Sequence, residues 1–460
     1  MIQIDNQLCP DDLLSGVTRL FEVSAAKISA LEKRWNARNG TPVFTVKGKY
    51  TSRGWTEWTQ GFQFGGALLQ FDVTGDKKFL ELGRRRTVEF MAPHLTNIGV
   101  HDHGFNNVST YGNLLRLIKE GRIPANTWEE NYYKQALMVS GAVQASRWTR
   151  LGENQGYVYS FNGPHSLFAD TIRSMRALAA SHALGHRLMG EMDRPVNLLH
   201  RLLQHAETTA RYNVYYGQGR DFYDIRGRVA HESIFNLNDG NYRCPSSQQG
   251  YSPFSTWTRG LSWILLGFAE QLEFLETLPG SSFSEDGGKT KILARFQEVA
   301  EAVADFYIEY TPTDGIPYWD TGAPGLSQMR NYLDEPANPF NEHEPVDSSA
   351  AAISAQGLLR LGKYLSRSKT SARGRKYFQT GLTVARTLLS DTYLSTDLRH
   401  EGLLLHSVYH RPNGWDYIPP KRKVPCGESS MWGDYHAREL AALLWRLGKK
   451  QTYPTFFNIL

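Results

Sequence analysis

The feature that most constrains the fold is a helical spacing of apolar residues that returns along almost the whole chain. In the first stretch, residues 13–35, the apolar side chains share one helix face: Leu14, Val17, Leu20, Phe21 and Ile28. The same spacing returns at residues 57–73, 77–92, 105–119, 127–149, 166–186, 193–212, 255–276, 290–309, 347–365, 371–390 and 430–447. Strand-like segments are few and short, as at residues 43–46 and 403–405. The pattern predicts an all-α fold of about twelve helices.

Nothing in the chain marks a domain boundary. A length of 460 residues would allow more than one domain, but no long low-complexity linker interrupts the helical pattern. The polar segment 280–289 is typical of a loop between two helices. We therefore expect one domain that spans residues 1–460.

Short motif-like clusters lie at or near the starts of alternate helices. They are residues 58–62 (WTQGF), 101–105 (HDHGF), Asp170, 257–260 (WTRG), 347–349 (DSS) and 433–435 (GDY). This alternation predicts helical hairpins closed in a ring, whose inner helices begin at one common mouth. Helix N-termini carry unpaired N–H groups and the positive end of the helix dipole, which favours an anionic ligand there.

Charge and cysteine content exclude several classes of function. The net charge of +5 is small and dispersed, so it does not favour nucleic acid, and the run 84–86 is typical of a solvated helix face. Cys9, Cys244 and Cys426 are widely spaced, without a CxxC pair, which fits a reducing compartment. No signal-like N-terminus and no apolar run of ~20 residues is present. We expect a cytoplasmic protein, or a periplasmic one if a leader has been removed, without nucleic-acid or membrane partners.

Two carboxylates are candidates for chemistry. Asp102 lies between His101 and His103, and Asp170 begins a helix that is apolar on one face. Each could serve only as a helix cap. The two histidines could hold a metal, but no second histidine-rich motif accompanies them, so we predict none. If the two helices are neighbours in the ring, the carboxylates converge, and paired carboxylates of unequal proton affinity are typical of enzymes that cut glycosidic bonds.

A third cluster could bind an acidic sugar. Arg259 and Trp263 are four residues apart and share a helix face, and Gln249 precedes them. Arginine offers a planar fork for a carboxylate, and tryptophan offers a stacking plane. The chain is rich in aromatic residues, with 11 Trp, 23 Tyr and 22 Phe, which mildly favours a carbohydrate site. Packing in a large core is the plainer explanation for these residues.

Taken together, the clusters resemble glycoside hydrolase family 88, the unsaturated glucuronyl hydrolases. The motifs stand in the family's order and cover almost the whole chain: residues 58–62, 101–105, Asp170, 249–263, 314–320 (DGIPYWD), 347–353 (DSSAAAI), 404–408 (LLHSV) and 432–435 (WGDY). Each motif alone is weak, whereas eight in order are strong. The family usually has Asn and Met shortly after this Asp, whereas here residues 172–175 (IRSM) follow Asp170 and Thr171, and Arg173 and Arg176 add positive charge nearby.

The resemblance implies an (α/α)6 barrel and an enzyme that releases a 4,5-unsaturated uronic acid from the non-reducing end of lyase-generated oligosaccharides. The residue matching Asp170 protonates C4 of the vinyl ether and activates water for C5, and the residue matching Asp102 assists. Because an enol ether needs a strong local acid, we expect burial to raise the pKa of Asp170. By the same matching the substrate-binding residues are Trp58, His101, His205, Gln249, Arg259, Trp263, Ser429 and Ser430. No metal or cofactor is implied, and we expect a monomer or a homodimer with an anionic oligosaccharide as its partner.

Three alternatives stay open at the level of sequence. An unsaturated rhamnogalacturonyl hydrolase would share the ring and the reaction but release a different sugar. A polysaccharide lyase on a similar toroid would need a Tyr/His pair that acts on an intact uronate. A non-catalytic sugar-binding protein would bind normally without Asp170. The adjoining sugar is not determined by any of these motifs.

Overall fold

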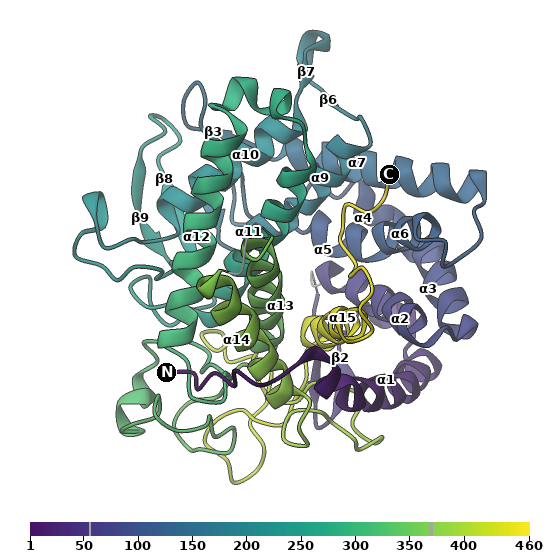
Figure 1. The fold of residues 1–460 in the computed structure, drawn as a ribbon, viewed down its shortest axis with the longest axis vertical. Coiled ribbons are helices and arrows are strands. Elements are labelled where there is room, and N and C mark those ends of the chain that lie inside the picture. Colours follow the sequence, from purple (N-terminus) through teal and green to yellow (C-terminus); the bar gives the residue numbers. More distant parts are fainter. Residues whose placement is uncertain (55–56, 368–370) are drawn as a thin grey trace.

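Six helical segments form the inner wall of a closed ring in the computed structural model, which describes residues 1–54, 57–367 and 371–460. Each segment contacts the next, and the last one returns to the first (Figure 1). In ring order the segments are α2 (Gln60–Thr74); α5 (His103–Asn107) with the π-helical turn η4 (Val108–Gly112) and α6 (Asn113–Lys119); α8 (Thr171–Ser174) with α9 (Arg176–Ala183); α11 (Thr258–Thr277); α13 (Ser348–Leu365); and α15 (Met431–Gly448).

An outer layer of helices covers this wall. It consists of α1 (Leu14–Arg34), α3 (Lys77–Phe90), α7 (Thr127–Ser146), α10 (Leu198–Tyr212), α12 (Lys289–Glu309) and α14 (Ala372–Leu388). Helix α3 packs on α2, α7 and α10 on α9, α12 on α11, and α14 on α13, while α1 packs on α15 and α2. Inner and outer helices alternate along the chain, so the predicted (α/α)6 fold is confirmed, and a helix is found in each predicted helical stretch.

Short elements fill the connections between the helices. The remaining helices are α4 (Ala92–Leu95), η1 (Pro10–Leu13), η2 (Ala37–Asn39), η3 (Glu57–Thr59), η5 (Glu191–Asp193), η6 (Gly219–Asp221), η7 (Gly280–Asp286) and η8 (Pro324–Gln328). The strands are β1 (Phe44–Val46), β2 (Lys49–Thr51), β3 (Trp148–Arg150), β4 (Gly156–Val158), β5 (Ser166–Phe168), β6 (Leu188–Met189), β7 (Pro195–Val196), β8 (Glu232–Phe235) and β9 (Tyr242–Ser246). All pairings are antiparallel: β1 with β2, β3 with β4, β6 with β7, and β8 between β5 and β9.

Two local predictions need correction. The helix expected from residue 166 begins only after Asp170, because residues 166–168 pair with β8 as a strand. The strand-like segment 403–405 forms a single bridge between Leu394 and Leu404 instead of a strand. Both segments are apolar and short, and the pairing partner, not the local sequence, decides their conformation.

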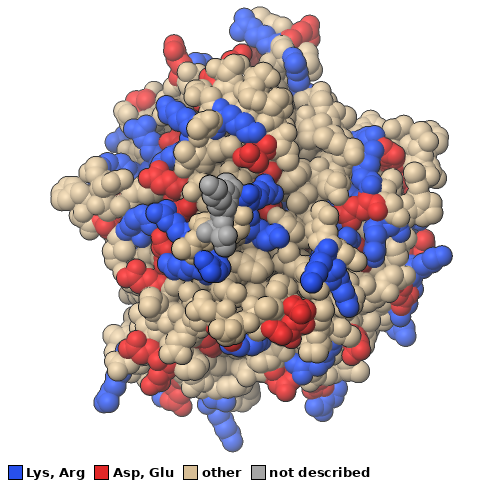
Figure 2. Space-filling view, viewed as in Figure 1, with Lys and Arg blue, Asp and Glu red and all other residues tan. Residues whose placement is uncertain are grey.

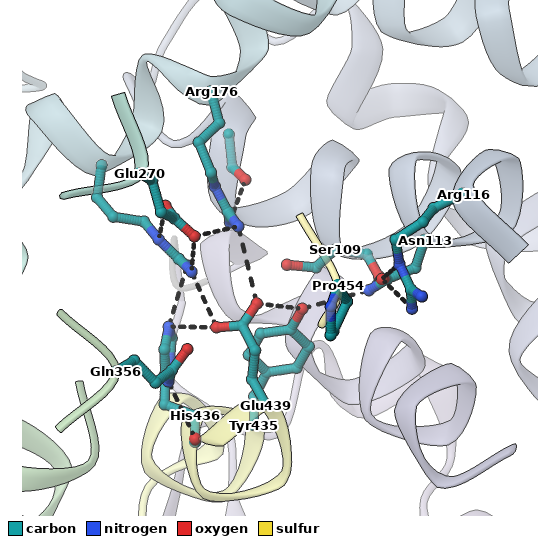
Figure 3. Close-up of polar contacts among 12 residues, drawn as sticks. Ser109, Asn113, Arg116, Arg176, Glu270, Gln356, Tyr435, His436, Glu439 and Pro454 are labelled. Atoms are coloured by element: carbon teal, nitrogen blue, oxygen red, sulfur yellow. Dashed lines mark hydrogen bonds and ion pairs between the residues drawn. The ribbon is translucent and has the colours of Figure 1, made fainter. Parts of the chain in front are cut away.

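A buried cluster of charged residues ties three inner helices together in the middle of the ring. The Arg173 side chain, which comes from α8, contacts Glu270 of α11 at 2.9 Å and Glu439 of α15 at 2.8 Å. Arg176 lies 3.8 Å from each of the same two carboxylates (Figure 3). The two arginines therefore do not add free positive charge beside Asp170; they are neutralised within the core.

The surface charge is mixed. Lys and Arg side chains are interspersed with Asp and Glu side chains over the face shown in Figure 2. Among the described helices, none combines the length and apolarity that crossing a membrane would require.

Candidate active site

A cavity of about 290 Å³ opens where the inner helices begin. Its aromatic wall consists of Trp58, Phe105, Phe161, Trp257, Trp263, Tyr409 and Trp415. Its polar groups are His101, Asp102, Asp170, Gln248, Gln249, Arg259, His410 and Asn413. The structure thus brings most of the predicted site residues to one place. A larger groove of about 680 Å³ lies between α10 and α12, and none of the predicted residues is among the described residues that line it.

A glycine contact brings the two carboxylates together. A β-carbon on Gly104 of α5 would lie 2.2 Å from the carbonyl oxygen of Ser174 of α8, so only glycine allows the two helices to approach this closely. The Gly104 N–H donates to the Ser174 hydroxyl at 2.9 Å, and that hydroxyl donates to the His101 carbonyl at 2.6 Å. The starts of α5 and α8 are thereby held side by side.

Asp102 and Asp170 occupy the N-cap positions of α5 and α8 without capping them. Neither side chain accepts a hydrogen bond from the backbone of its own helix, and each residue is only 8% exposed. Asp347, by contrast, caps α13 by accepting from the N–H groups of Ser349 and Ala350. The capping explanation for Asp102 and Asp170 is therefore excluded, and both carboxylates line the cavity.

His101 lies between the two carboxylates. Its Nε2 atom is 3.4 Å from Asp170 Oδ1 and 3.8 Å from Asp102 Oδ1. The ring stacks on Phe161 at 5.9 Å between centroids. Within the described chain, neither His101 ring nitrogen nor Asp170 Oδ1 makes a hydrogen bond, although all three atoms are buried. His101 Nε2 and Asp170 Oδ1 instead face each other as a buried pair, which attracts when the imidazole is protonated.

The two carboxylates differ in proton affinity. Burial raises the pKa of Asp102, and the neighbouring charge of Asp170 raises it further. Burial alone would also raise the pKa of Asp170, but the contact with His101 and the positive charge of Arg259 hold that pKa below its usual value. The expectation that burial raises the pKa of Asp170 is therefore wrong for the free protein, and Asp102 retains its proton to higher pH.

Arg259 is held rigidly by the protein. Its two terminal nitrogens donate to Asp347 Oδ2 (2.9 Å), Gln249 Oε1 (3.0 Å) and the carbonyls of Val408 (2.5 Å) and Tyr409 (2.8 Å). The guanidinium also lies between the rings of Trp257 and Trp432, at 4.7 and 4.9 Å from their centroids. The planar fork expected to grip a carboxylate thus binds protein acceptors, and the charge of Arg259 is paired with the buried carboxylate of Asp347.

Aromatic rings close the bottom of the cavity. Trp58 stacks on Trp432 at 5.2 Å, and Phe105 packs against Trp263 at 4.9 Å. Trp263 in turn contacts the ring of His436 at 5.0 Å, and His436 hydrogen-bonds Arg173 of the buried charge cluster at 3.1 Å. The cavity therefore ends on a solid core.

Three of the predicted residues do not line the cavity. His205 is buried behind its wall, where Nδ1 accepts from the N–H of Val158 at 3.2 Å and burial lowers its pKa to about 3. The Ser430 hydroxyl caps α15 by accepting from the N–H of Gly433 at 3.0 Å. The backbone of Ser429 pairs with Thr45, and its side chain is fully buried.

His231 lies close to the site and was missed in the sequence. Its ring packs on Phe168 at 4.5 Å and on Trp257 at 4.7 Å. Its Nδ1 accepts from the N–H groups of Gln248 and Gln249, and burial lowers its pKa to about 4. A lone histidine next to a short strand offers no motif, so only the fold reveals it. No group of three or more potential metal ligands occurs among the described residues.

These observations define an (α/α)6-barrel protein with two unequal carboxylates in an aromatic cavity at the mouth of the ring. The crystal structure of the unsaturated glucuronyl hydrolase from Bacillus sp. GL1 matches it with a TM-score of 0.69 at 22% identity, over 95% of this chain and 97% of that one. Two curated relatives are also named unsaturated glucuronyl hydrolase. That of Formosa agariphila is 26% identical over 386 residues, covering 83% of this chain and 78% of the relative. That of Bacillus sp. is 27% identical over 412 residues, covering 86% and 89%.

No protein-family model matches the chain. The resemblance to unsaturated glucuronyl hydrolases that the motifs indicated is nevertheless confirmed by these relatives.

Proposed function

We propose that this protein is a glycosidase that releases 4,5-unsaturated uronic acid from the non-reducing end of lyase-generated oligosaccharides. The observation that carries the proposal is the pair of buried, non-capping carboxylates, Asp102 and Asp170, on either side of His101 in an aromatic cavity. The names of the curated relatives support the same reaction, and they give no support to a rhamnogalacturonyl hydrolase or a lyase.

The reaction is a hydration of a vinyl ether. Asp170 delivers a proton to C4, and the positive charge that develops is shared by C5 and the ring oxygen. The Asp170 carboxylate then takes a proton from a water molecule, whose oxygen bonds to C5. The resulting hemiketal opens, and the bond from C1 to the adjoining sugar breaks. Asp102 orients the ring hydroxyls, and Trp58 and Trp263 pack against the sugar.

The proton on Asp170 is acquired together with the substrate. In the free protein the neighbours of Asp170 lower its pKa, so the carboxylate is ionised. A bound uronate brings a second negative charge and displaces water, and both changes raise the pKa of Asp170. The Arg259 guanidinium, which Asp347 and Gln249 hold in place, favours a uronate carboxylate in the cavity without a direct grip.

We further propose that residues 1–460 act as one catalytic domain. The protein works as a monomer or a homodimer in the cytoplasm, or in the periplasm if it is exported. The cavity residues do not determine which sugar adjoins the unsaturated uronic acid.

A panel of unsaturated disaccharides from different lyases tests the proposed function. Loss of the near-UV absorbance of the conjugated double bond is expected for at least one of them. An Asp170→Asn protein measured in parallel separates enzymatic from spontaneous loss. If no disaccharide of the panel loses absorbance faster with the wild-type protein than with buffer, the proposed function is wrong.

A further inference from the structure

A loop with exposed aromatic residues leaves the cavity and returns to it. Gln248 and Gln249 at one end of the loop, and Trp257 at the other, all line the cavity. Between them Tyr251 is 52% exposed and Phe254 is 73% exposed. Tyr251 follows Gln249 by two residues and Phe254 precedes Trp257 by three, so both rings are carried close to the cavity wall along the chain.

A second loop next to it carries another aromatic pair. Phe222 and Tyr223 follow η6 and are 76% and 70% exposed. Their rings meet edge to face at 5.8 Å, so they form one small surface. A contiguous group of exposed aromatic rings, unlike a single exposed ring, is uncommon on a folded chain and typically marks a binding surface.

Arg228 fastens the two loops to each other. Its buried guanidinium binds both carboxylate oxygens of Asp224, at 2.6 and 2.7 Å, next to the Phe222–Tyr223 pair. The same group donates to the carbonyls of Pro253 and Ser255, at 3.2 and 3.4 Å, on either side of Phe254. The four aromatic rings, which we call the aromatic shelf, are therefore carried by loops fixed to each other before any ligand binds, which lowers the entropy cost of binding.

The exposed charge beside the shelf is positive. Of the acidic residues in the second loop, Asp221 is buried and accepts from the N–H of Tyr216, and Asp224 is paired with Arg228. Arg220 and Arg226 of the same loop are exposed. Asp305, the ion-pair partner of Arg226, is shared with Lys376, so a net positive charge remains there.

We propose that the aromatic shelf binds the saturated sugar rings of an anionic oligosaccharide whose unsaturated end occupies the cavity. This inference rests on the proposed function and extends it to substrate length. Aromatic faces pack flat on sugar rings, and the neighbouring arginines attract the uronates of such a chain. The shelf is continuous with the cavity wall, so one chain can reach both. Tyr251 and Phe254 contact the sugars nearest to the cavity, and Phe222 and Tyr223 contact those farther along.

A chain-length series of unsaturated substrates tests the shelf. The wild-type kcat/KM is expected to rise from disaccharide to tetrasaccharide to hexasaccharide, mainly through a lower KM. The paired change Tyr251→Ser with Phe254→Ser should lower kcat/KM for the tetrasaccharide by about tenfold, which corresponds to ~1.4 kcal/mol. The paired change Phe222→Ser with Tyr223→Ser should affect the hexasaccharide more than the tetrasaccharide.

Trp128→Ser is the matched control. Trp128 is an equally bulky exposed aromatic residue, 84% exposed in the first turn of α7, far along the chain from both loops. It should leave the entire length series unchanged. Tetrasaccharide binding to Asp170→Asn protein, measured by calorimetry with and without the shelf substitutions, gives the same comparison without turnover.

The outcomes separate the two proposals. Equal wild-type kcat/KM at all lengths, or a length series insensitive to the shelf substitutions, would overturn the shelf alone. If the substitutions instead convert a dimer to a monomer in sedimentation experiments and leave the length series intact, the shelf is a subunit interface and the inference is wrong. Failure to cleave even the disaccharide would overturn the proposed function itself.

Discussion

The carboxylates of Asp102 and Asp170 can face the cavity because they do not cap the helices that they precede. The side chain of an aspartate at a helix start normally accepts hydrogen bonds from backbone N–H groups of that helix, as Asp347 does at α13. Asp102 and Asp170 hold the same position at α5 and α8, yet neither accepts a backbone hydrogen bond of its helix. At the scale of single residues, this difference separates the catalytic candidates from the structural ones.

Asp170→Asn is expected to fold normally and to bind substrate while its turnover falls by ~10²–10⁴-fold or more, the usual contribution of general acid–base catalysis. Asparagine keeps the size of the side chain but cannot carry the proton to C4. Turnover is measured on the best unsaturated disaccharide, and circular dichroism checks the fold. Near-normal turnover by the folded variant would refute the role of Asp170.

His101→Asn should move the basic limb of the kcat/KM profile, on which activity falls as Asp170 loses its proton, to higher pH. His101 is one of the groups that hold the pKa of Asp170 down, and it also lowers the pKa of Asp102, so its removal raises both. The profile of kcat/KM against pH reports the free enzyme. His94→Asn is a suitable control, because His94 is buried but does not line the cavity. An unchanged limb, or one at lower pH, contradicts the electrostatic assignment.

The sequence predicted the residues whose position follows from a motif at a helix start. It could not predict the pKa of Asp170, because the deciding neighbour, His101, comes from the segment before α5 and not from α8. Nor could it show that Arg259 is occupied by Asp347 and Gln249, or that Ser430 caps α15 instead of reaching the cavity. These facts depend on contacts across the ring.

At the scale of the elements, the ring is closed by charge as well as by apolar packing. Arg173 joins α8, the helix that begins after Asp170, to Glu270 of α11 and Glu439 of α15. All three side chains are largely or fully buried. The cluster therefore links the position of a catalytic candidate to two neighbouring helices.

Arg173→Ala should lower the free energy of unfolding by about 3–5 kcal/mol, because it leaves buried carboxylates without their principal partner. Urea denaturation followed by circular dichroism measures the change. The control Arg399→Ala removes an exposed arginine paired with Asp397 and should stay within about 0.5 kcal/mol of wild type. Similar small effects from both substitutions would show that the cluster does not stabilise the ring.

The long helices were predictable because their apolar period repeats over several turns. The strands of residues 148–168 and 232–246 were not, because each has only three to five residues and takes its conformation from a partner distant in sequence. His231 directly precedes β8, one of these short strands, so the sequence-based prediction of the site lacked this residue.

At the scale of the whole molecule, many histidines are buried in the neutral form. Burial lowers the pKa of His94, His103, His231, His406 and His410 to about 4, and of His205 and His436 to about 3. In the unfolded chain these groups return to about 6.5. Between those values the unfolded state binds more protons than the folded state, so acid favours unfolding. His101, whose pKa is raised by the aspartates, acts in the opposite direction.

Stability is therefore expected to be fully present above pH ~6.5 and to fall as the pH drops toward ~4, with each buried histidine contributing up to about 1.4 kcal/mol per pH unit. Urea midpoints determined at several pH values across this range measure the slope. His436→Gln should reduce it by the share of one histidine. A midpoint that stays constant or rises on acidification contradicts the prediction.

The solid bottom of the cavity has a consequence for the order of events after bond cleavage. Trp263 and His436 close the ring above the charge cluster, so among the described residues the cavity opens at the mouth through which the chain end enters. The freed uronic acid then lies deepest, beneath the shortened oligosaccharide. The oligosaccharide must leave first and the acid last, and each round requires the chain to dissociate completely. The released acid should thus be a competitive product inhibitor, the shortened oligosaccharide should not, and steady-state inhibition patterns with the two products will test this order.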